Sequence, residues 1–339
     1  MEVKIGFIGF GTVGRGFAEI LVNKKEYLSE RYGIEWKVVA IADPVWGMIH
    51  NPEGIDLKKA VELVDSGQKI ESLGETGWDS IKVARESEAD VIVEVTPTNI
   101  KNGEPGLTHI REALSAKKHV ITTNKGPIAL AYKELKALAD SNGVKLGFEG
   151  TVLAGTPALN LARWPLGGVY FEEVRGIVNG TTNYILTNME AGRSYEEVLK
   201  EAQKLGYAEA DPTADVEGFD AMAKVLILAN VLFDANLKVD DVERVGITHL
   251  TVEDIEKAKS EGKRWKLLAK VWREGDVVKA KVSPEMVGKN DPLFHIMGVT
   301  NALVFKTDHL GEVTIIGPGA GRTATGHALL ADLIEIFGR

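Results

Sequence analysis

The stretch from Gly206 to Phe233 contains a helix-length segment in which a carboxylate and an ammonium lie among apolar side chains. In residues 218–233 only Asp220, Lys224 and Asn230 are polar. A helix that is apolar nearly all round is normally buried, and residues four apart share one of its faces. The sequence therefore predicts that Asp220 and Lys224 lie together in the interior of a folded domain.

This pair has two interpretations. A structural ion pair at this spacing contributes only about 0.2–0.5 kcal/mol on an exposed helix, and its net contribution in a core is less certain still. The alternative is that Lys224 faces a cleft and transfers protons, which would explain why the chain tolerates the cost of burying a charge. The second interpretation is favoured here.

Four more carboxylates lie just before this helix. They could cap helix N-termini or complement a helix dipole, and one or two of them would be enough for that. Four carboxylates beside a buried lysine favour a pocket for a cationic group, such as a substrate ammonium. The four residues are Glu209, Asp211, Asp215 and Glu217.

Composition excludes several classes of protein. The 339 residues are enough for two domains, and 44% hydrophobic with 26% charged residues is typical of a globular protein. A formal net charge of -9 and a pI near 5.4 argue against a nucleic-acid partner. The absence of Cys excludes disulfides and thiolate sites, and the seven His show no zinc-ligand spacing. Without a signal-peptide pattern or an 18-residue apolar window, we expect a cytoplasmic protein with no membrane partner.

The N-terminus predicts a dinucleotide site. An apolar strand pattern over Val3 to Ile8 leads into Gly-x-Gly-x-x-Gly and then into a helical pattern. The first Gly allows a tight turn, the second lets the main chain approach a pyrophosphate, and the third allows close helix–strand packing. In this context the motif favours a dinucleotide site over a chance glycine turn. Its residues are Gly9, Phe10, Gly11, Thr12, Val13 and Gly14.

Asp43 ends the second predicted strand, Trp36 to Ala42, and is the residue type that accepts hydrogen bonds from an adenosine ribose. It lies further from the glycine motif than is usual, because a polar segment intervenes. It predicts a preference for NAD over NADP. Lys58 and Lys59, which follow in a helical stretch, could instead bind a 2′-phosphate or simply face solvent.

Two later strand patterns end in polar residues. Residues 91–95 lead to Thr96, and residues 119–123 lead to Lys125. In an open parallel sheet, ligands bind beyond the carboxyl ends of the strands, so both residues are predicted to lie near the nicotinamide. Lys125 could instead be an exposed loop lysine. Its position in the sequence favours neither this interpretation nor a place near the nicotinamide.

The pattern changes after residue 148. Capping boxes begin helices at Ser194 and Thr251, and two pairs of strand-like runs read as hairpins, which predicts a mixed or antiparallel sheet. A glycine-rich segment at 317–322, containing Gly319, then precedes a last helix and either binds the cofactor or is an ordinary connection. The predicted fold is α/β: a Rossmann-type parallel sheet in residues 1–148, rejoined by 317–339, and an α+β substrate and dimerisation domain in residues 149–316.

Several motifs together resemble homoserine dehydrogenase over nearly the whole chain. They are GFGTVG at 9–14, TNKGPIA at 123–129, GIVNGTTNYIL at 176–186, LGYAEADPTADVEGFDAMAK at 205–224 and GPGAGRTATG at 317–326. The fourth is the most specific. The resemblance implies an oxidoreductase that interconverts L-homoserine and L-aspartate 4-semialdehyde with NAD or NADP, on the route to threonine and methionine.

The resemblance also implies roles for individual residues. Lys224 would be the catalytic proton donor and Lys125 a second catalytic lysine beside the nicotinamide. The substrate site would comprise Gly180, Thr181, Tyr207, Glu209, Asp215 and Asp220, with the carboxylates binding the ammonium. A monovalent cation, Na or K, would be bound by a loop comprising Glu149, Val152, Ala154 and Thr156, mostly through main-chain carbonyls.

This resemblance is to the short, monofunctional form, without kinase or regulatory domains. Exposed sheet edges in the second domain predict a homodimer. Two alternatives stay open: a dehydrogenase of the same layout acting on another small amino or hydroxy acid, and a non-catalytic dinucleotide-sensing protein. The sensor would not need Lys224.

Overall fold

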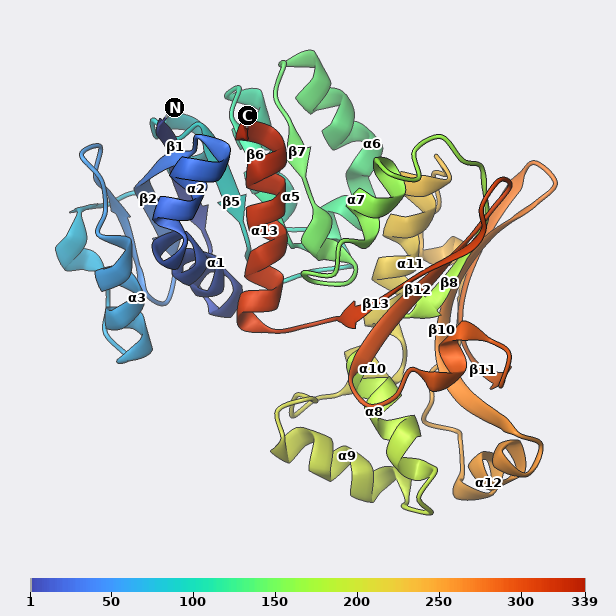
Figure 1. Cartoon of the computed structure of the whole chain (residues 1–339). Helices are drawn as coiled ribbons and strands as arrows, with labels where there is room; N and C mark the ends of the chain where they lie inside the picture. Colours follow the sequence, from blue (N-terminus) through green and yellow to red (C-terminus); the bar gives the residue numbers. More distant parts are fainter. Residues whose placement is uncertain (1, 339) are drawn as a thin grey trace. The chain divides into compact units, whose positions relative to one another are not determined.

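The computed structural model describes residues 2–338. The chain forms two compact units, Met1–Gly155 with Ala320–Arg339, and Thr156–Gly319. Figure 1 shows the helices and strands of both units. No helix within residues 2–338 combines the length and the apolar character needed to cross a bilayer.

Unit 1 is built on a seven-stranded sheet in the order β4-β3-β2-β1-β5-β6-β7. Its strands are β1 Glu2–Ile8, β2 Glu35–Asp43, β3 Gly47–His50, β4 Glu75–Thr76, β5 Val91–Glu94, β6 His119–Thr122 and β7 Leu146–Gly147. Its helices are α1 Thr12–Asn23, α2 Lys25–Tyr32, α3 Leu57–Asp65, α4 Ser80–Glu86, α5 Gly106–Ser115, α6 Lys125–Ser141 and α13 Arg322–Phe337, with short 3₁₀ turns η1 Glu71–Leu73 and η2 Glu149–Thr151.

The five strands from β2 to β7 in this order pair in parallel. The pairings of β2 with β3 and of β3 with β4 are antiparallel. Parallel strands joined by helices bury both faces of a sheet, which explains the continuous apolar runs of β1 and β5. The predicted Rossmann-type parallel sheet is confirmed. Because its strands are parallel, β1, β5 and β6 end at the same edge, where the sequence places the glycine motif, Thr96 and Lys125.

The C-terminal helix α13 packs against α1 inside unit 1 (Figure 1). Leu329 and Leu333 of α13 belong to the same buried cluster as Phe17 of α1. The helices approach closely at Gly16, where a Cβ would fall 2.1 Å from the carbonyl oxygen of Arg322. Glycine is therefore required at position 16. The close contact of α1 with α13 joins the last helix to the core of unit 1 beside the glycine motif.

Unit 2 is built on a six-stranded sheet in the order β13-β12-β8-β10-β11-β9. Its strands are β8 Phe171–Ile177, β9 Val242–Arg244, β10 Lys263–Glu274, β11 Val277–Gly288, β12 Thr300–Thr307 and β13 Gly311–Pro318. Its helices are α7 Ala158–Arg163, α8 Gly180–Met189, α9 Tyr195–Lys204, α10 Thr213–Val216, α11 Phe219–Leu232 and α12 Val252–Ser260, with 3₁₀ turns η3 Val239–Asp241 and η4 Pro292–His295.

The two predicted hairpins, β10–β11 and β12–β13, are confirmed, and β8 pairs antiparallel between them. Helices α8, α11 and α12 pack against these strands. Ser194 and Thr251 cap α9 and α12 through complete capping boxes, as the sequence predicts. The second unit is therefore the expected α+β arrangement, and its central helix α11 buries every residue in 221–230.

Some boundaries differ from those expected. The segment between α1 and β2, expected as polar chain, contains the helix α2. Helix α6 begins at Lys125 and is kinked at Ala131, where the main chain is locally non-helical. The last strand of unit 1, β7, pairs with β6 through residues 146–147 alone.

Candidate active site

The glycine motif lies between the end of β1 and the start of α1. Gly9 has a φ of +95°, and a Cβ there would fall 2.7 Å from the carbonyl oxygen of Val95. At Gly11, which precedes α1, a Cβ would meet no atom within 4 Å, so the approach to this helix N-terminus is open. Main-chain N–H groups at an open helix N-terminus are suited to a pyrophosphate. The residues present therefore fit a dinucleotide.

Asp43 is buried at the end of β2, with 7% of its surface exposed. Its Oδ2 accepts a hydrogen bond from the N–H of Phe10 at 2.7 Å. Its Oδ1 accepts from the N–H groups of Val45 and Trp46 at 2.9 and 3.0 Å. The carboxylate thus joins the glycine motif to the turn after β2. The alternative candidates for binding a phosphate, Lys58 and Lys59, are exposed on α3.

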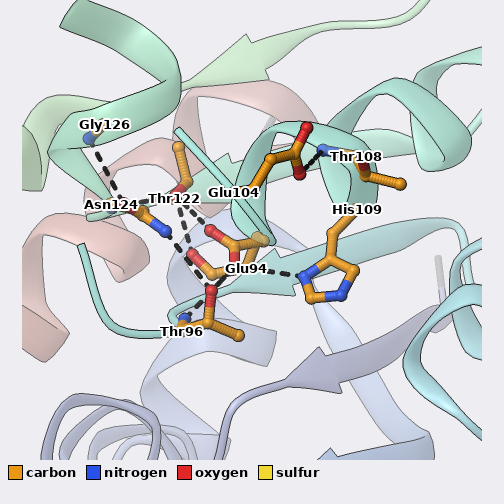
Figure 2. Close-up of polar contacts among 8 residues, drawn as sticks. All are labelled: Glu94, Thr96, Glu104, Thr108, His109, Thr122, Asn124 and Gly126. Atoms are coloured by element: carbon orange, nitrogen blue, oxygen red, sulfur yellow. Dashed lines mark hydrogen bonds and ion pairs between the residues drawn. The ribbon is translucent and has the colours of Figure 1, made fainter. Parts of the chain in front are cut away.

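A buried carboxylate, Glu94, organises the ends of β5 and β6 (Figure 2). It is completely buried at the end of β5. Its Oε1 accepts hydrogen bonds from the hydroxyl and, at 3.2 Å, from the N–H of Thr96. The hydroxyl of Thr122 donates to the Glu94 carbonyl at 2.7 Å, and Nδ1 of His109 lies 3.5 Å from Oε1.

This network extends to the start of α6 (Figure 2). Asn124 caps the helix, because its Oδ1 accepts from the N–H of Gly126 at 3.2 Å. Its Nδ2 therefore points the other way and donates to the Thr96 hydroxyl at 3.3 Å. Since that hydroxyl gives its own proton to Glu94, Thr96 can only accept a hydrogen bond from a ligand. The same cap determines where Lys125, the first residue of α6, is placed.

Lys224 is buried on α11 of unit 2, with 6% of its surface exposed. Its ammonium donates to the Val178 carbonyl at 2.6 Å and to Oδ2 of Asp220 at 2.7 Å. Val178 lies just after β8, so the lysine connects the helix to the end of that strand. The predicted pairing of Asp220 with Lys224 is confirmed by these contacts.

Asn179 brings a second carboxylate to this pair. Its Nδ2 donates to Oδ1 of Asp215 at 2.7 Å and to Oδ2 of Asp220 at 3.0 Å. Its Oδ1 accepts from the N–H of Thr182 at 2.9 Å and caps α8. Burial raises the pKa of Asp215, and the nearby Asp220 charge acts in the same direction, while Asn179, Lys224 and Thr181 oppose it. A carboxylate in this state gains most from a cationic partner.

The other predicted substrate residues lie at and around the start of α8. Gly180 and Thr181 are its first residues, and the Thr181 hydroxyl donates to the Tyr207 carbonyl at 2.5 Å. The Tyr207 ring, 43% exposed, packs against that of Tyr184. Glu209 is exposed.

Two of the four clustered carboxylates have local roles. Asp211 accepts from the N–H of Thr213 before α10, and Glu217 accepts from the hydroxyl of Thr248. The capping and structural interpretation therefore applies to these two. Asp215 is the member of the set that Asn179 joins to Asp220 and Lys224.

The predicted cation loop lies partly in each unit. In unit 1, Glu149 is 1% exposed in η2, Val152 is buried, and Ala154 has a φ of +49°. In unit 2, the Thr156 hydroxyl donates to the Pro318 carbonyl at 2.9 Å. Residues 2–338 contain no group of three His, Cys, Asp or Glu side chains arranged to hold a metal. One buried carboxylate with main-chain carbonyls is the kind of oxygen donor set that hard cations accept.

Three polar residues that hold these sites were not singled out from the sequence: Asn179, Glu94 and Asn124. Asn179 and Asn124 each precede a helix start directly, so a capping signal was available for both. Glu94 gave no signal, because a single carboxylate inside an apolar strand pattern looks like a solvent-facing residue.

Two family models match the chain in series. The homoserine dehydrogenase NAD-binding domain matches residues 9–149, and the homoserine dehydrogenase domain matches residues 157–334. The chain belongs to the homoserine dehydrogenase family. The first range lies in unit 1, and the second covers nearly all of unit 2 and continues into α13 of unit 1. Both the glycine motif and the Asp215–Asp220–Lys224 cluster therefore lie in regions typical of homoserine dehydrogenases.

Individual relatives agree. The chain is 44% identical to an NAD(+)-dependent homoserine dehydrogenase from Pseudomonas canavaninivorans, over 99% of this chain and 96% of that protein. It is also 44% identical to a homoserine dehydrogenase from Methanocaldococcus jannaschii, over 99% and 98%. A hyperthermophilic archaeal homoserine dehydrogenase solved with NADPH superposes with a TM-score of 0.84 at 32% identity, covering 99% of this chain and 98% of that one.

The family decides between the open alternatives. Homoserine dehydrogenases are oxidoreductases that interconvert L-homoserine and L-aspartate 4-semialdehyde, and this chain is an enzyme of that kind. The dehydrogenase of another small acid and the non-catalytic sensor are therefore not supported.

Proposed function

We propose that Lys224 transfers the proton in homoserine dehydrogenation, and that Lys125 is the second catalytic lysine. The observation that carries this proposal is the burial of the Lys224 ammonium between the Val178 carbonyl and Asp220. Burial of a charged lysine is costly, and a structural pair recovers little of that cost. A lysine held rigidly by two acceptors is well placed to act on one substrate atom.

The bound dinucleotide supplies hydride chemistry at the carbinol carbon. The residues of this chain handle the charge that develops on the substrate oxygen. In the direction of aldehyde reduction, the Lys224 ammonium stabilises the forming alkoxide and delivers a proton to that oxygen. In the opposite direction the neutral amine of Lys224 accepts the hydroxyl proton. Asp220 keeps the ammonium in position throughout.

The substrate ammonium binds to the carboxylate of Asp215, with Asp220 beside it. Asn179 holds these two carboxylates at 2.7 and 3.0 Å from its own Nδ2. Burial disfavours the charge on Asp215, and a bound ammonium would restore it. Gly180 and Thr181 at the start of α8, with Tyr207 and Glu209, complete the proposed substrate site.

The dinucleotide binds to unit 1 through the glycine motif, 9–14, with Thr96 and Lys125 toward the nicotinamide. Gly319 is proposed as a further cofactor contact. Asp43 favours NAD, because a carboxylate near the ribose 2′-hydroxyl repels a 2′-phosphate. A relative that is NAD(+)-dependent supports this preference, whereas another solved with NADPH shows that the family is permissive.

Three further proposals concern the whole molecule. A monovalent cation binds to Glu149 and to main-chain oxygens of Val152, Ala154 and Thr156. The protein is a homodimer, because the strands β13 and β9 at the sheet edges of unit 2 need cover. It operates in the cytoplasm, on the route to threonine and methionine.

One experiment tests the catalytic assignment directly. Turnover of L-homoserine with NAD and NADP is followed through the absorbance of the reduced nicotinamide, in the wild-type protein and in Lys224→Ala. We expect activity in the wild type and a loss of about 10²–10⁴-fold in the variant, the usual share of general acid–base catalysis. Near wild-type turnover in Lys224→Ala would end the assignment.

A further inference from the structure

Asn183 and Asn301 of unit 2 are almost completely buried, at 1% and 0% exposed, and their surroundings differ. The Nδ2 of Asn183 donates to the carbonyls of Ile296 and Thr300 at 3.3 and 3.1 Å, and its Oδ1 accepts from Lys266 at 3.0 Å. Asn301 is completely buried on β12, and within residues 2–338 neither polar atom of its amide has a hydrogen-bond partner. The fold satisfies one amide fully and the other not at all.

An unsatisfied buried amide is a cost to the fold. Leaving a buried donor or acceptor without a partner destabilises the folded state, because the group loses its hydrogen bonds to water and gains none in return. An apolar residue of similar size on β12 would avoid that cost, and folded proteins rarely leave such groups unpaired without a reason. A ligand that bonds to the amide would supply the reason for Asn301.

The position of Asn301 indicates what the amide faces. A Cβ on Gly180, the first residue of α8, would fall 3.5 Å from Oδ1 of Asn301. The unpaired side chain therefore points at the N-terminus of a ten-residue helix. There the first N–H groups have no acceptor within the helix, and the helix dipole attracts an anion. Asn179 caps this helix and also bonds to Asp215.

Gly319 covers the amide. A Cβ on Gly319 would fall 2.2 Å from Nδ2 and 2.7 Å from Oδ1 of Asn301. The main chain at Gly319 therefore lies directly on both polar atoms without bonding to either. Any ligand of Asn301 must displace this cover, which belongs to a glycine-rich segment.

The chemistry of the two atoms restricts the ligand. Nδ2 requires an acceptor, and the helix N-terminus beside it favours a carboxylate. Oδ1 requires a donor, such as an ammonium. An α-amino acid carries a carboxylate and an ammonium on one carbon, so its head group can bond to both atoms of a single amide.

We propose that Asn301 and the N-terminus of α8 bind the α-amino-acid head of the substrate, and that Gly319 moves aside to admit it. Nδ2 donates to the carboxylate and Oδ1 accepts from the ammonium, which also faces Asp215. The inference rests on the proposed assignment of Gly180 and Thr181 to the substrate site. The inference adds Asn301 as a residue that binds the substrate carboxylate, a group that the nearby Asp215 and Asp220 carboxylates would repel.

The test is the affinity of Asn301→Ala for three compounds, measured by calorimetry on enzyme saturated with NADH. They are L-homoserine, 3-aminopropan-1-ol, which lacks the carboxylate, and 4-hydroxybutanoate, which lacks the ammonium. We expect homoserine affinity to fall about 10- to 100-fold, the range for a lost hydrogen bond to a charged group. The affinity for 3-aminopropan-1-ol should fall less, because Asp215 still binds its ammonium when the contact to Oδ1 is lost, and that for NADH should not change.

Asn183→Ala is the matched control. It leaves Lys266 and two carbonyls unsatisfied, so its melting temperature should fall by several degrees. Asn301→Ala removes two unsatisfied polar atoms, so its melting temperature should not fall by a comparable amount. A second variant, Asn301→Asp, keeps the shape but replaces the donor with a negative charge. It should weaken binding of homoserine and 4-hydroxybutanoate and spare 3-aminopropan-1-ol.

Two results would overturn the inference. One is homoserine affinity within twofold of wild type in both Asn301 variants. The other is a fall in melting temperature with equal losses for all three compounds, which would show a structural role. Failure of the proposed function gives a different result. It would appear as near wild-type turnover in Lys224→Ala, a variant in which Asn301 is unchanged.

Discussion

Asp220 and Lys224 lie one helical turn apart on α11, and Oδ2 of the carboxylate is 2.7 Å from the lysine ammonium. The lysine is the more deeply buried of the two, with 8% of its side chain exposed against 17% for Asp220. The same Oδ2 also accepts from Asn179. The carboxylate therefore both neutralises the lysine and connects it to the start of α8, which gives the pair a positioning role that an isolated surface pair would lack.

Lys224→Ala should separate catalysis from stability. We expect kcat to fall about 10²–10⁴-fold while NADH affinity stays near wild type, because the glycine motif, Asp43 and Thr96 belong to unit 1, whereas Lys224 belongs to unit 2. The matched control is Lys118→Met. Lys118 is another buried lysine, bonded to the carbonyls of Ser87 and Ala89 in unit 1, and its loss should lower the melting temperature and spare kcat. Equal kcat losses in both variants would indicate that burial of a lysine, not its chemistry, is what matters.

The second prediction concerns coupling within the pair. Asp220→Asn should weaken homoserine binding and also disturb the lysine, so its effect on kcat/KM overlaps with that of Lys224→Ala. The double variant should therefore cost less than the sum of the two single changes, by about 0.5–3 kcal/mol of coupling. Additive costs, measured from kcat/KM of the three variants, would show that the two side chains act independently.

Much of this arrangement could be predicted from the sequence, because it depends on local patterns. The i,i+4 spacing of Asp220 and Lys224 within an apolar helix predicts both their contact and their burial. The glycine motif after an apolar strand predicts the parallel sheet. Ser194 and Thr251 define helix starts through their capping boxes.

What could not be predicted depends on contacts between distant segments. Asn179 reaches Asp215 and Asp220, 36 and 41 positions away in the chain. Nothing in the spacing of the four clustered carboxylates shows that Asp215 is joined to Asn179 while Asp211 accepts from the N–H of Thr213. Asn301 is a polar residue in a strand pattern, and only the packing of Gly319 and Gly180 around it shows that its amide is unpaired.

The third prediction concerns pH. Burial raises the pKa of Asp215 in the folded protein above its value in the unfolded chain. The folded protein therefore binds this proton more readily, so the group favours folding at low pH and opposes it once pH rises through the folded pKa. Asp215→Asn should raise the melting temperature at pH 7, and the gain should disappear as the pH falls below the ordinary aspartate range. The variant should also bind homoserine more weakly.

Thermal melts of both proteins across acidic and neutral pH would check this prediction. Asp211→Asn is the control, because hydrogen bonds to Thr213 lower the pKa of Asp211 and reverse the sign. A melting temperature of Asp215→Asn that stays below wild type at pH 7 would contradict the argument.

The fourth prediction concerns Asp43. Its carboxylate already accepts three main-chain hydrogen bonds, from Phe10, Val45 and Trp46. Asp43→Asn keeps an acceptor but removes the charge that would repel a 2′-phosphate. We expect NADH affinity to fall and NADPH affinity to rise, so that the preference for NADH shrinks. Equilibrium binding of both dinucleotides measures this, with Lys58→Ala and Lys59→Ala as tests of the competing phosphate contacts. A wild-type protein that binds NADPH more tightly than NADH would show that Asp43 does not decide the preference.

The fifth prediction concerns Glu94, which orients polar residues next to the proposed catalytic residue Lys125. Its Oε1 accepts from the Thr96 hydroxyl, and that hydroxyl accepts from Asn124, the N-cap of the helix that begins at Lys125 (Figure 2). Glu94→Gln keeps the size but introduces a donor into this chain of bonds. The Thr96 hydroxyl can then turn around, and its ability to accept from the nicotinamide is lost.

We expect the Glu94→Gln enzyme to bind NADH about tenfold more weakly, as for one lost hydrogen bond. Its affinity for adenosine diphosphate ribose, which lacks the nicotinamide, should be unchanged. Glu112→Gln on α5 is the control, since that carboxylate pairs with Arg85 at the surface and should alter neither affinity. Equal losses for NADH and adenosine diphosphate ribose would mean that Glu94 supports the glycine motif generally. An unchanged NADH affinity with a lower melting temperature would mean that its network only stabilises the ends of β5 and β6.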